Sequence, residues 1–305
     1  MRHILLLNPT AGRGDRTDAL RREAERVFAA RGEPYEILTG KYPGHVRELA
    51  RAVAGQGEEA VVYACGGDGT LSEAAGGLAG SRACALAPVA IGSGNDFVRY
   101  FGDDAAKRFR SLQALADGVS RPIDLLRVGD LVCLNIASAG FDAAVCARMP
   151  AFRRLPFVSG PAAYRLALAE GFLTRIRHRF AFEIDGRAVP AEEYVFAVAA
   201  NGSFYGGGFH AAPRASLRDG LIDLVRVPAL PRLRMLRMAG AYRRGEHLDR
   251  YPFIRFERCR SVRFLSGAPI EMNLDGEIVS LQNPLVTVDP GALLLRVPAV
   301  FADKI

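Results

Sequence analysis

The chain has 305 residues, of which 50% are hydrophobic and 24% charged, and its formal net charge is +7 at pH 7. This composition is typical of a folded globular protein and excludes a disordered chain, and the length favours two domains. The five cysteines are scattered and odd in number, which argues against a disulfide framework and against a zinc site. The positive charge suits an anionic partner without specifying its class.

The first third of the chain alternates short apolar runs with segments of helical periodicity. The spacing predicts helices over residues 17–31, 45–53 and 105–118, and strands over residues 4–7, 35–38, 60–64 and 83–91. Strands that are apolar throughout are typical of sheets covered on both faces. We therefore expect a parallel sheet with helices packed on each side.

After about residue 122 the pattern changes to strand-like alternation. Asp185-Gly186 and Asp275-Gly276 each follow an alternating segment and predict hairpin turns. This half should be a mainly antiparallel β domain. Its strands are expected over residues 131–136, 180–184, 194–200, 221–227, 261–265, 270–274 and 285–288, and a last strand over residues 293–297 can return to either domain.

Two domains follow from this change of pattern. The α/β domain is expected over residues 1–124 and the β-rich domain over residues 125–291. The last apolar run lies within residues 292–305 and can return to either domain.

Neither a membrane span nor a secretory signal is expected. The longest charge-free stretch, residues 194–213, is broken by Asn201-Gly202 and by three consecutive glycines. The N-terminal apolar run is too short for a signal peptide. We therefore expect a cytoplasmic protein.

A glycine-rich turn, Gly66-Gly67-Asp68-Gly69-Thr70, directly follows the third expected strand. Thr70 and Glu73 have the spacing of a capping box, which predicts that a helix begins here. Backbone N–H groups at a helix N-terminus, approached through glycines, bind anions well, so the turn predicts a phosphate site. Neither of the common nucleotide motifs, G-x-x-x-x-G-K-[ST] and G-x-G-x-x-G, occurs in the chain. The alternative is a strand-to-helix turn without a ligand.

Two further loops are expected at the same edge of the sheet. Residues 91–97, IGSGNDF, follow the next strand, and residues 8–14, NPTAGRG, follow the first. Ligands of open α/β sheets bind outside the carboxyl ends of the strands, so the three loops predict one binding site. Arg13 is a candidate phosphate contact there.

Three segments, NPTAGRG (8–14), GGDGTLSEAAGGL (66–78) and APVAIGSGNDFVRYF (87–101), resemble the N-terminal motifs of the diacylglycerol kinase catalytic-domain family. That family includes bacterial soluble diacylglycerol kinases and the sphingosine and ceramide kinases. The resemblance continues in the family's order through NIASAGFDA, NGSFYGGGFHAAPRASLRDGLIDL and NLDGE, over nearly the whole chain. The GGDG motif alone is less specific, because NAD kinases and phosphofructokinases share it.

By this resemblance, ATP binds in the cleft between an NAD-kinase-like α/β domain and the β domain. With Mg²⁺, its γ-phosphoryl group passes to a lipid hydroxyl such as that of diacylglycerol, in phospholipid biosynthesis. Ser93 stands where the family usually has Thr, which keeps the hydroxyl. The positions that match the family's nucleotide contacts are Asn8, Thr39, Gly66, Gly67, Asp68, Gly69, Thr70, Leu71, Ser72, Ser93, Asn95 and Asp96.

Phosphoryl transfer needs carboxylates near the phosphates. The resemblance implies an acidic set across the cleft, made of Asp68, Asp96, Asp124, Asp219, Asp275 and Glu277. Asp275 and Glu277 are candidate catalytic residues in one motif. Glu277 is favoured as the base for the lipid hydroxyl, with Asp68 as its rival. The family's structural Mg²⁺ site matches Ser216, Asp219 and Leu221, the first and last through backbone oxygens, which are ligands that Mg²⁺ accepts. Arg218 replaces an Asp usual in the family, which lowers the affinity expected of that site.

Residues 230–244 predict a basic amphipathic helix. Leu230, Leu233 and Leu236 recur on one face, with Arg234, Arg237 and Arg244 on another. The leucines can pack on the β domain, or the helix can attract an anionic membrane surface, which would make the protein peripherally membrane-associated.

Other functions stay open on the sequence alone. An NAD kinase or another kinase of a soluble substrate is one alternative, and a catalytically silent lipid- or nucleic-acid-binding protein is another. No nucleic-acid-binding signature is visible, so no nucleic-acid partner is expected. The sequence does not decide which lipid is phosphorylated, or whether the protein is a homodimer.

Overall fold

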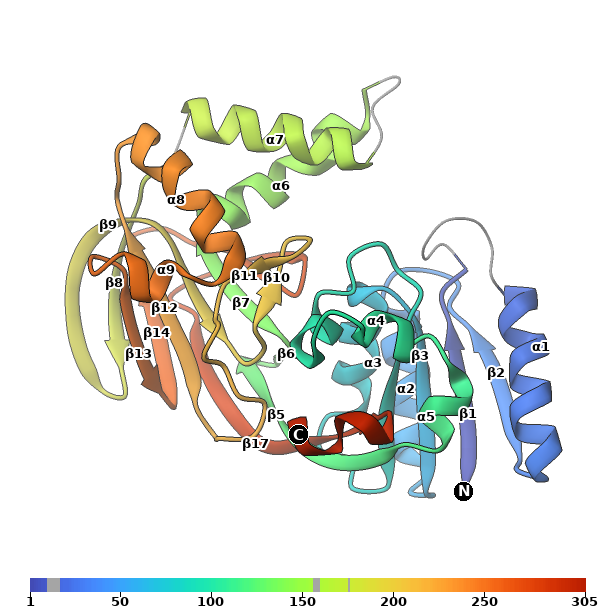
Figure 1. Cartoon of the computed structure of the whole chain (residues 1–305). Coiled ribbons are helices and arrows are strands. Elements are labelled where there is room, and N and C mark those ends of the chain that lie inside the picture. The colour runs from blue at the N-terminus through green and yellow to red at the C-terminus, as the bar shows by residue number, and fades with distance from the viewer. Residues whose placement is uncertain (10–16, 156–159, 175) are drawn as a thin grey trace.

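The N-terminal half of the computed structural model is a parallel sheet flanked by helices (Figure 1). The structure describes residues 1–9, 17–155, 160–174 and 176–305. The sheet strands are β1 (Arg2–Leu7), β2 (Tyr35–Thr39), β3 (Ala60–Gly66) and β4 (Cys84–Ala90), in the spatial order β4-β3-β1-β2. The helices of this half are α1 (Thr17–Phe28), α2 (His45–Gly55), α3 (Asp68–Leu78), α4 (Ala105–Arg108) and α5 (Leu112–Ala116), with 3₁₀ turns η1 (Ala29–Arg31) and η2 (Phe97–Phe101).

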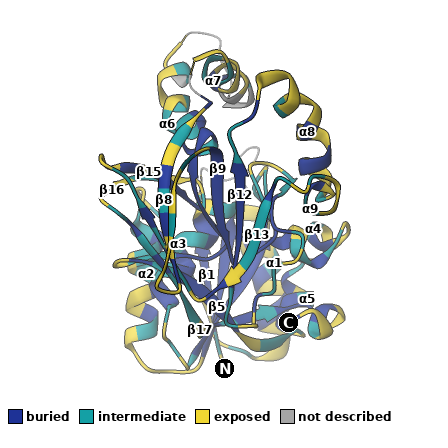
Figure 2. Cartoon of the chain, turned by 90° about the vertical axis from the view of Figure 1, so that its left-hand side faces the viewer, coloured by how far each residue is buried: buried dark blue, intermediate teal, exposed yellow. Residues whose placement is uncertain are grey.

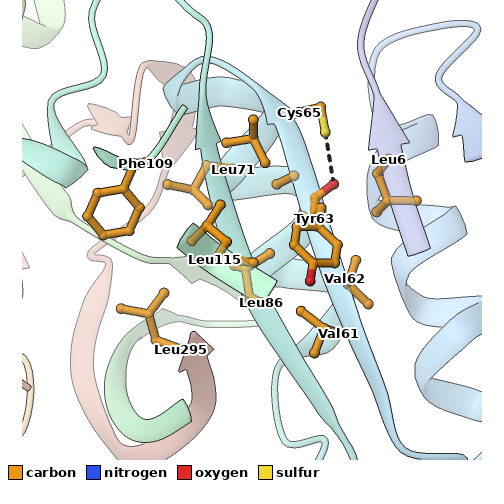
Figure 3. Close-up of a cluster of buried hydrophobic side chains, with 14 of the residues drawn as sticks. Leu6, Val61, Val62, Tyr63, Cys65, Leu71, Leu86, Phe109, Leu115 and Leu295 are labelled. Carbon is orange, nitrogen blue, oxygen red and sulfur yellow. Dashed lines mark hydrogen bonds between the residues drawn. The ribbon is translucent and has the colours of Figure 1, made fainter. Parts of the chain in front are cut away.

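Burial on both faces explains the uninterrupted apolar strands. Every residue of β3 and β4 is buried. The chain passes from β1 outward to β2 and then back across to β3, so right-handed crossovers place α1 on one face and α2 and α3 on the other. Figure 3 shows Tyr63, Leu86, Leu115 and Leu295 gathered in this core, where the Cys65 thiol donates to the Tyr63 carbonyl at 3.5 Å.

The C-terminal half is mainly antiparallel. Its strands are β7 (Ile136–Gly140), β8 (His178–Ile184), β9 (Arg187–Ala200), β10 (Phe204–Tyr205), β11 (Phe209–His210), β12 (Ile222–Pro228), β13 (Arg255–Cys259), β14 (Ser261–Leu265), β15 (Ile270–Leu274) and β16 (Glu277–Leu281). Its helices are α6 (Phe141–Arg153), α7 (Gly160–Thr174), α8 (Arg232–Arg244) and α9 (His247–Arg250). Because side chains alternate along a strand, β7 places Ala137 in one apolar core and Ile136 in a second, which the helices cover. The predicted fold class, an α/β half and a mainly antiparallel β half, is confirmed.

Two long strands join the halves (Figure 1). β17 (Leu285–Val297) pairs with β14 near its start and in parallel with β4 through Leu294 and Leu295 near its end. β5 (Val119–Val128) runs antiparallel to β17, and the predicted limit at residues 124–125 falls inside it. The chain then ends in a 3₁₀ turn, η3 (Ala299–Lys304). One sheet thus continues from one half into the other.

Several predicted elements have different limits. The strands expected over 285–288 and 293–297 are a single strand with an irregularity between Asp289 and Leu293. The helix expected over 105–118 is two short helices, the second capped by the Ser111 side chain, which accepts from the Ala114 N–H at 3.2 Å. The strand expected over 131–136 divides into β6 (Leu131–Cys133) and β7, because the N–H groups between them bond to a carboxylate described below.

Candidate active site

The glycine-rich turn brings β3 directly into α3. The helix begins at Asp68, with Gly67 in extended conformation as its N-cap. A Cβ atom at Gly66 would overlap the Thr70 side chain, so this close turn requires glycine there. The Leu71 N–H donates to Gly67 O at 3.0 Å as the first helical bond, and this leaves the N–H groups of Asp68, Gly69 and Thr70 without helical partners. A Cβ atom at Gly69 would meet nothing within 4 Å, so this position of the first turn is open.

The predicted capping box is wrong. The helix begins three residues earlier than that motif requires, so Thr70 lies in the first turn, where Asn8 Nδ2 donates to its Oγ1 at 3.0 Å. Glu73 caps the neighbouring helix α2 instead, accepting from Gly44 N at 3.0 Å and Val46 N at 3.2 Å. A carboxylate at a helix N-terminus is favourable, and it fixes the loop that follows Thr39.

The loop after β4 packs on the first one. A Cβ atom on Gly92 would overlap Gly67, and Asn95, at φ 53°, folds back so that its Nδ2 donates to Gly92 O at 2.8 Å. The Phe97 N–H donates to Asp68 Oδ1 at 3.2 Å. The structure therefore brings two of the predicted loops together. Of the third, Asn8 is described, and Arg13 lies outside the described residues.

Asp68 lies at the centre of this pair of loops. Burial, reinforced by the charges of Asp96 and Asp275, raises the pKa of Asp68 to about 6. The backbone N–H groups of Phe97 and Asp96 have a smaller, opposite effect on this pKa, because they favour the charged form. A carboxyl with a pKa near neutrality can exchange a proton with a substrate hydroxyl.

Asp96 joins the loops to the other half of the chain. Its Oδ2 accepts from Gly207 N, between β10 and β11, at 2.7 Å, and its Oδ1 lies 3.2 Å from Arg99 Nε. Asp96 therefore has partners from both halves and holds the β10–β11 loop against the site.

Asp275 is the most heavily bonded acid of the set. At φ 51° in its turn, it accepts from the N–H groups of Leu134, Asn135 and Ile136 at 2.6, 3.0 and 2.9 Å. It also accepts from Ser72 Oγ of α3 at 3.1 Å and from the Cys133 thiol at 3.2 Å. A carboxylate offers about four acceptor sites, so these donors from both halves fill the hydrogen-bonding capacity of Asp275.

Glu277 lies at the start of β16, with 68% of its side chain exposed. Its Oε2 is 3.3 Å from Arg47 Nη2 on α2, so it also reaches across to the first half. Arg47 was not among the predicted site residues. No sequence signal could have shown it, because the pair is 230 residues apart.

The predicted magnesium residues have contacts of their own. Asp219 Oδ1 accepts from Leu221 N at 3.1 Å, and its Oδ2 is 3.9 Å from Arg258 Nη1. The set of one carboxylate and two backbone oxygens suits Mg²⁺ in kind, although Arg258 already supplies positive charge beside it. Ser216 accepts through its Oγ from Arg218 N at 3.4 Å.

Asp124, another acid of the predicted set, contacts the loop that carries Asp219. It is buried and accepts from Gly220 N at 2.7 Å and Gly291 N at 2.8 Å, so it ties the Asp219 loop to β17. Throughout the part of the chain that the structure describes, no three His, Cys, Asp or Glu side chains gather as metal ligands. The predicted magnesium set holds only one such side chain, so it would not form such a cluster.

The remaining predicted contacts differ in accessibility. Leu71 is in the core and its N–H is used in the helix, so neither faces a ligand. Thr39 ends β2 beside Leu7, at the carboxyl edge of the sheet, and Ser93 lies in the Gly92–Asn95 loop. A hollow of about 420 Å³ lies away from these residues, lined in part by Arg51, Ser81, Arg127 and Asp130.

Comparison with known proteins gives two family matches. Residues 2–128 match the model of the diacylglycerol kinase catalytic domain, and residues 135–297 match that of the YegS C-terminal NAD kinase beta sandwich-like domain. A Pseudomonas aeruginosa (strain PAO1) protein named "Probable lipid kinase YegS-like" is 32% identical over 92% of this chain and 88% of its own. The chain belongs to the diacylglycerol kinase catalytic-domain family.

Other members of the diacylglycerol kinase family agree with this assignment. A Bacillus subtilis (strain 168) protein named "Diacylglycerol kinase" is 28% identical over 90% of this chain and 88% of its own. A solved structure of a diacylglycerol kinase from Bacillus anthracis strain Sterne has the same fold, with a TM-score of 0.69 over 100% of this chain and 98% of that chain at 17% identity. In the present chain, none of the helices among the described residues is both long and apolar enough to span a bilayer.

Proposed function

We propose that the protein is an ATP- and Mg²⁺-dependent lipid kinase that transfers the γ-phosphoryl group to a lipid hydroxyl, of diacylglycerol or a similar lipid, between the two halves. The observation that carries the proposal is Asp68. Its carboxyl has a pKa of about 6, stands at the start of a helix with free N–H groups, and lies near the Asp275 turn of the other half. ATP would supply the phosphoryl group, and Mg²⁺ would neutralise charge on the phosphates.

Each residue then has a task. The N–H groups of the first turn of α3 hold phosphate, with Asn8 fixing Thr70 beside them. Asp68 takes the proton of the attacking hydroxyl. Asp275 accepts from Ser72 and from the β6–β7 segment, and it thereby holds α3 against the half of the chain that would bind the lipid. We propose Asp68 rather than Glu277 as the base because Glu277 is exposed and paired with Arg47.

A transfer assay tests the activity directly. Labelled ATP with Mg²⁺ is offered to vesicles that contain diacylglycerol, monoacylglycerol, a sphingoid base, ceramide or phosphatidylglycerol, and to NAD in solution. We expect label in at least one lipid and its loss on chelation of Mg²⁺. Label in NAD alone would replace this function with that of a soluble-substrate kinase.

Replacing Glu277 with Gln should lower kcat/KM less than about fivefold. An exposed ion pair contributes about 0.2–1 kcal/mol, whereas loss of a general base costs about 10²- to 10⁴-fold in rate. Arg47→Ala should lower kcat/KM by a similarly small factor. The double variant Glu277→Gln/Arg47→Ala should lower kcat/KM little more than the single variant with the larger effect. Glu271→Gln, an exposed acid on neighbouring β15, is the matched control. A hundredfold loss in Glu277→Gln alone would make Glu277 the base.

We also propose that the protein associates with an anionic membrane surface through α8 and the end of α7. The expectation that the leucines of residues 230–244 pack on the β domain holds for Leu230, which precedes α8. It is wrong for Leu233 and Leu236, which are 60% and 58% exposed because Met238 and Tyr242 face the core instead. Figure 2 displays the exposed surface of α8 and α7 at one end of the molecule. The arginines of α8 suit acidic headgroups beside these leucines.

Two hydrogen bonds from one arginine side chain join α7 and α8. Arg232 Nε donates to Phe172 O at 2.7 Å and its Nη2 to Leu173 O at 3.0 Å. Leu173 is 72% exposed, so three exposed leucines, Leu173, Leu233 and Leu236, belong to two joined helix ends. Insertion of such exposed leucines into the interface of a bilayer is favourable, because it removes apolar surface from water.

The variant Leu233→Ser/Leu236→Ser should bind vesicles of phosphatidylcholine and phosphatidylserine at least about tenfold more weakly. Full burial of a leucine contributes about 1.5–3 kcal/mol, so partial insertion of two suffices for this effect. Co-sedimentation measures it, and Val300→Ser, exposed in η3, is the control. Unchanged binding of the double variant would exclude this surface.

A further inference from the structure

A hollow of about 420 Å³ is bounded by the ends of α2 and α3, the turn after α3, and the hairpin that β5 and β6 form. Figure 1 shows β6 beside α3, and these two elements contact each other at the junction of the halves. The volume of the hollow is in the range of sites for small ligands. The four polar side chains that line it, Arg51, Ser81, Arg127 and Asp130, therefore indicate what kind of ligand fits.

Arg51 and Arg127 reach the hollow from different parts of the fold. Arg51 on α2 is exposed, and no described residue gives its guanidinium a hydrogen bond or an ion pair. Arg127 on β5 is partly buried, and its Nε and Nη2 atoms both lie 2.9 Å from Asp289 Oδ2. This contact fixes the orientation of Arg127 and leaves its Nη1 group without a described acceptor. Guanidinium groups bind phosphate oxygens through paired N–H donors, so the two arginines suit a phosphate group.

The other two polar side chains of the hollow are a hydroxyl and a carboxylate. Ser81 Oγ accepts from Cys84 N at 3.1 Å, which leaves its own hydrogen to be donated. Asp130, in the β5–β6 turn, is exposed and has no hydrogen bond or ion pair with a described residue. A carboxylate accepts and does not donate, so it disfavours a second anionic group and matches hydroxyls. The four side chains together fit a ligand that carries one phosphate group and free hydroxyls.

We propose that this hollow is a second anion site, which binds a small phosphomonoester with free hydroxyl groups. The phosphate can belong to a soluble polyol phosphate or to the headgroup of a phosphorylated lipid, since both present the same chemistry. Arg51 belongs to a helix of the first half and Arg127 to a strand that joins the halves, so the ligand would hold these elements together. This inference is independent of the lipid kinase function, because none of its residues has a task in that reaction.

Calorimetric titration with glycerol 3-phosphate tests the site on the unmodified full chain. The titration is performed with and without adenylyl imidodiphosphate and Mg²⁺, which compete for any phosphate site at the start of α3. We expect saturable binding of one equivalent in both cases. Inorganic phosphate should bind at least about fivefold more weakly, because it does not place hydroxyls beside Asp130. Displacement of glycerol 3-phosphate by the nucleotide would overturn the proposal.

Vesicles distinguish the two sources of the phosphate group. Co-sedimentation is measured with phosphatidylcholine vesicles that contain 1-oleoyl-lysophosphatidate, for the unmodified protein and for Arg51→Ala. Vesicle binding that this variant weakens would assign the site to a lipid headgroup. Saturable binding of glycerol 3-phosphate without such vesicle binding would assign it to a soluble ligand. Binding of neither probe would overturn the proposal.

Variants at the hollow separate a specific site from a general attraction to positive charge. Arg51→Ala should weaken the binding of glycerol 3-phosphate at least about tenfold, because a charge-assisted contact is lost. Its Tm without ligand should be unchanged, since Arg51 has no described partner. Arg22→Ala, at another exposed arginine of a neighbouring helix, α1, is the matched control. Equal weakening by the two variants would overturn the proposal.

Two further variants test the shape of the site and its polar recognition. A Cβ atom at Gly55, which lines the hollow, would meet nothing within 4 Å, so Gly55→Leu should fill the space and abolish binding. Asp130→Ala should weaken the binding of glycerol 3-phosphate and leave that of inorganic phosphate no weaker. If Asp130→Ala did not weaken the binding of glycerol 3-phosphate, the recognition of hydroxyls would be excluded.

Discussion

Replacing Asp68 with asparagine should lower kcat/KM for phosphoryl transfer about 10²- to 10⁴-fold, the range expected when a general base is removed. The amide keeps the size of the side chain and an oxygen that can still accept from the Phe97 N–H. The change therefore removes proton transfer with little disturbance of the loops. The exposed Asp103→Asn, on the segment that follows η2, should have near wild-type activity.

The pH dependence provides a second readout of Asp68. With a pKa of about 6 in the folded protein, the base is protonated below that pH, so wild-type activity should rise as pH increases through about 6. The folded pKa lies above the ordinary value of 3.8, so between these values the folded state binds more protons than the unfolded state. The free energy of unfolding contributed by Asp68 should thus fall as pH rises over this window. Asp68→Asn should lose both dependences, and retention of more than a tenth of wild-type activity would exclude Asp68 as the base.

The variant Asp275→Ala should lower the free energy of unfolding by at least about 3 kcal/mol and abolish activity. The carboxylate satisfies the N–H groups of Leu134, Asn135 and Ile136, and each buried donor that loses its partner costs about 1–3 kcal/mol. The bond from Ser72, which joins α3 to this turn, is lost as well. Urea denaturation measures the free energy of unfolding. Activity should be measured on the same samples, because the variant also frees the β6–β7 segment, and a loss of activity can then be compared with the loss of stability.

A second Asp-Gly turn is a matched control. Asp185, at φ 47°, accepts from Arg260 N at 2.9 Å and Ser261 N at 2.8 Å, but this turn is exposed and has no contact with α3. Asp185→Ala should therefore cost about 1 kcal/mol and leave activity unchanged. If the two variants were equally stable, the special position of Asp275 between the halves would have no energetic effect.

The most reliable sequence predictions were those of strands and turns, which depend on residues that are close together in the chain. The all-apolar strands β3 and β4 predicted a sheet covered on both faces, and glycines in Gly66-Gly67 and Gly92 predicted close turns. The Asp275-Gly276 pair predicted a hairpin, and the structure has that turn between β15 and β16. Each of these features depends on residues a few positions apart, so periodicity and turn chemistry are sufficient to find them.

Contacts between distant segments were beyond such reasoning. Glu73 has the correct spacing for a capping box, yet it caps α2, 29 residues before it, because the helix began at Asp68. Leu236 has the correct spacing for a packed face, yet it is exposed because the other side of α8 meets the core. A local sequence pattern shows which side chains can cap a helix or pack on a core, and the tertiary packing determines which of these contacts form.

By itself, the sequence determined the two kinds of domain, the loops at the carboxyl edge of the sheet and the acids that they carry, because these follow from local order along the chain. Only the tertiary structure decided the surroundings of each acid. Asp68 acquires a pKa near neutrality because burial and the charges of Asp96 and Asp275 act on it together. Asp275 is saturated by donors from β6–β7 and α3, and Glu277 is paired with Arg47 from 230 residues away. Proton affinity and hydrogen bonding depend on distance in space, which the order of residues does not contain.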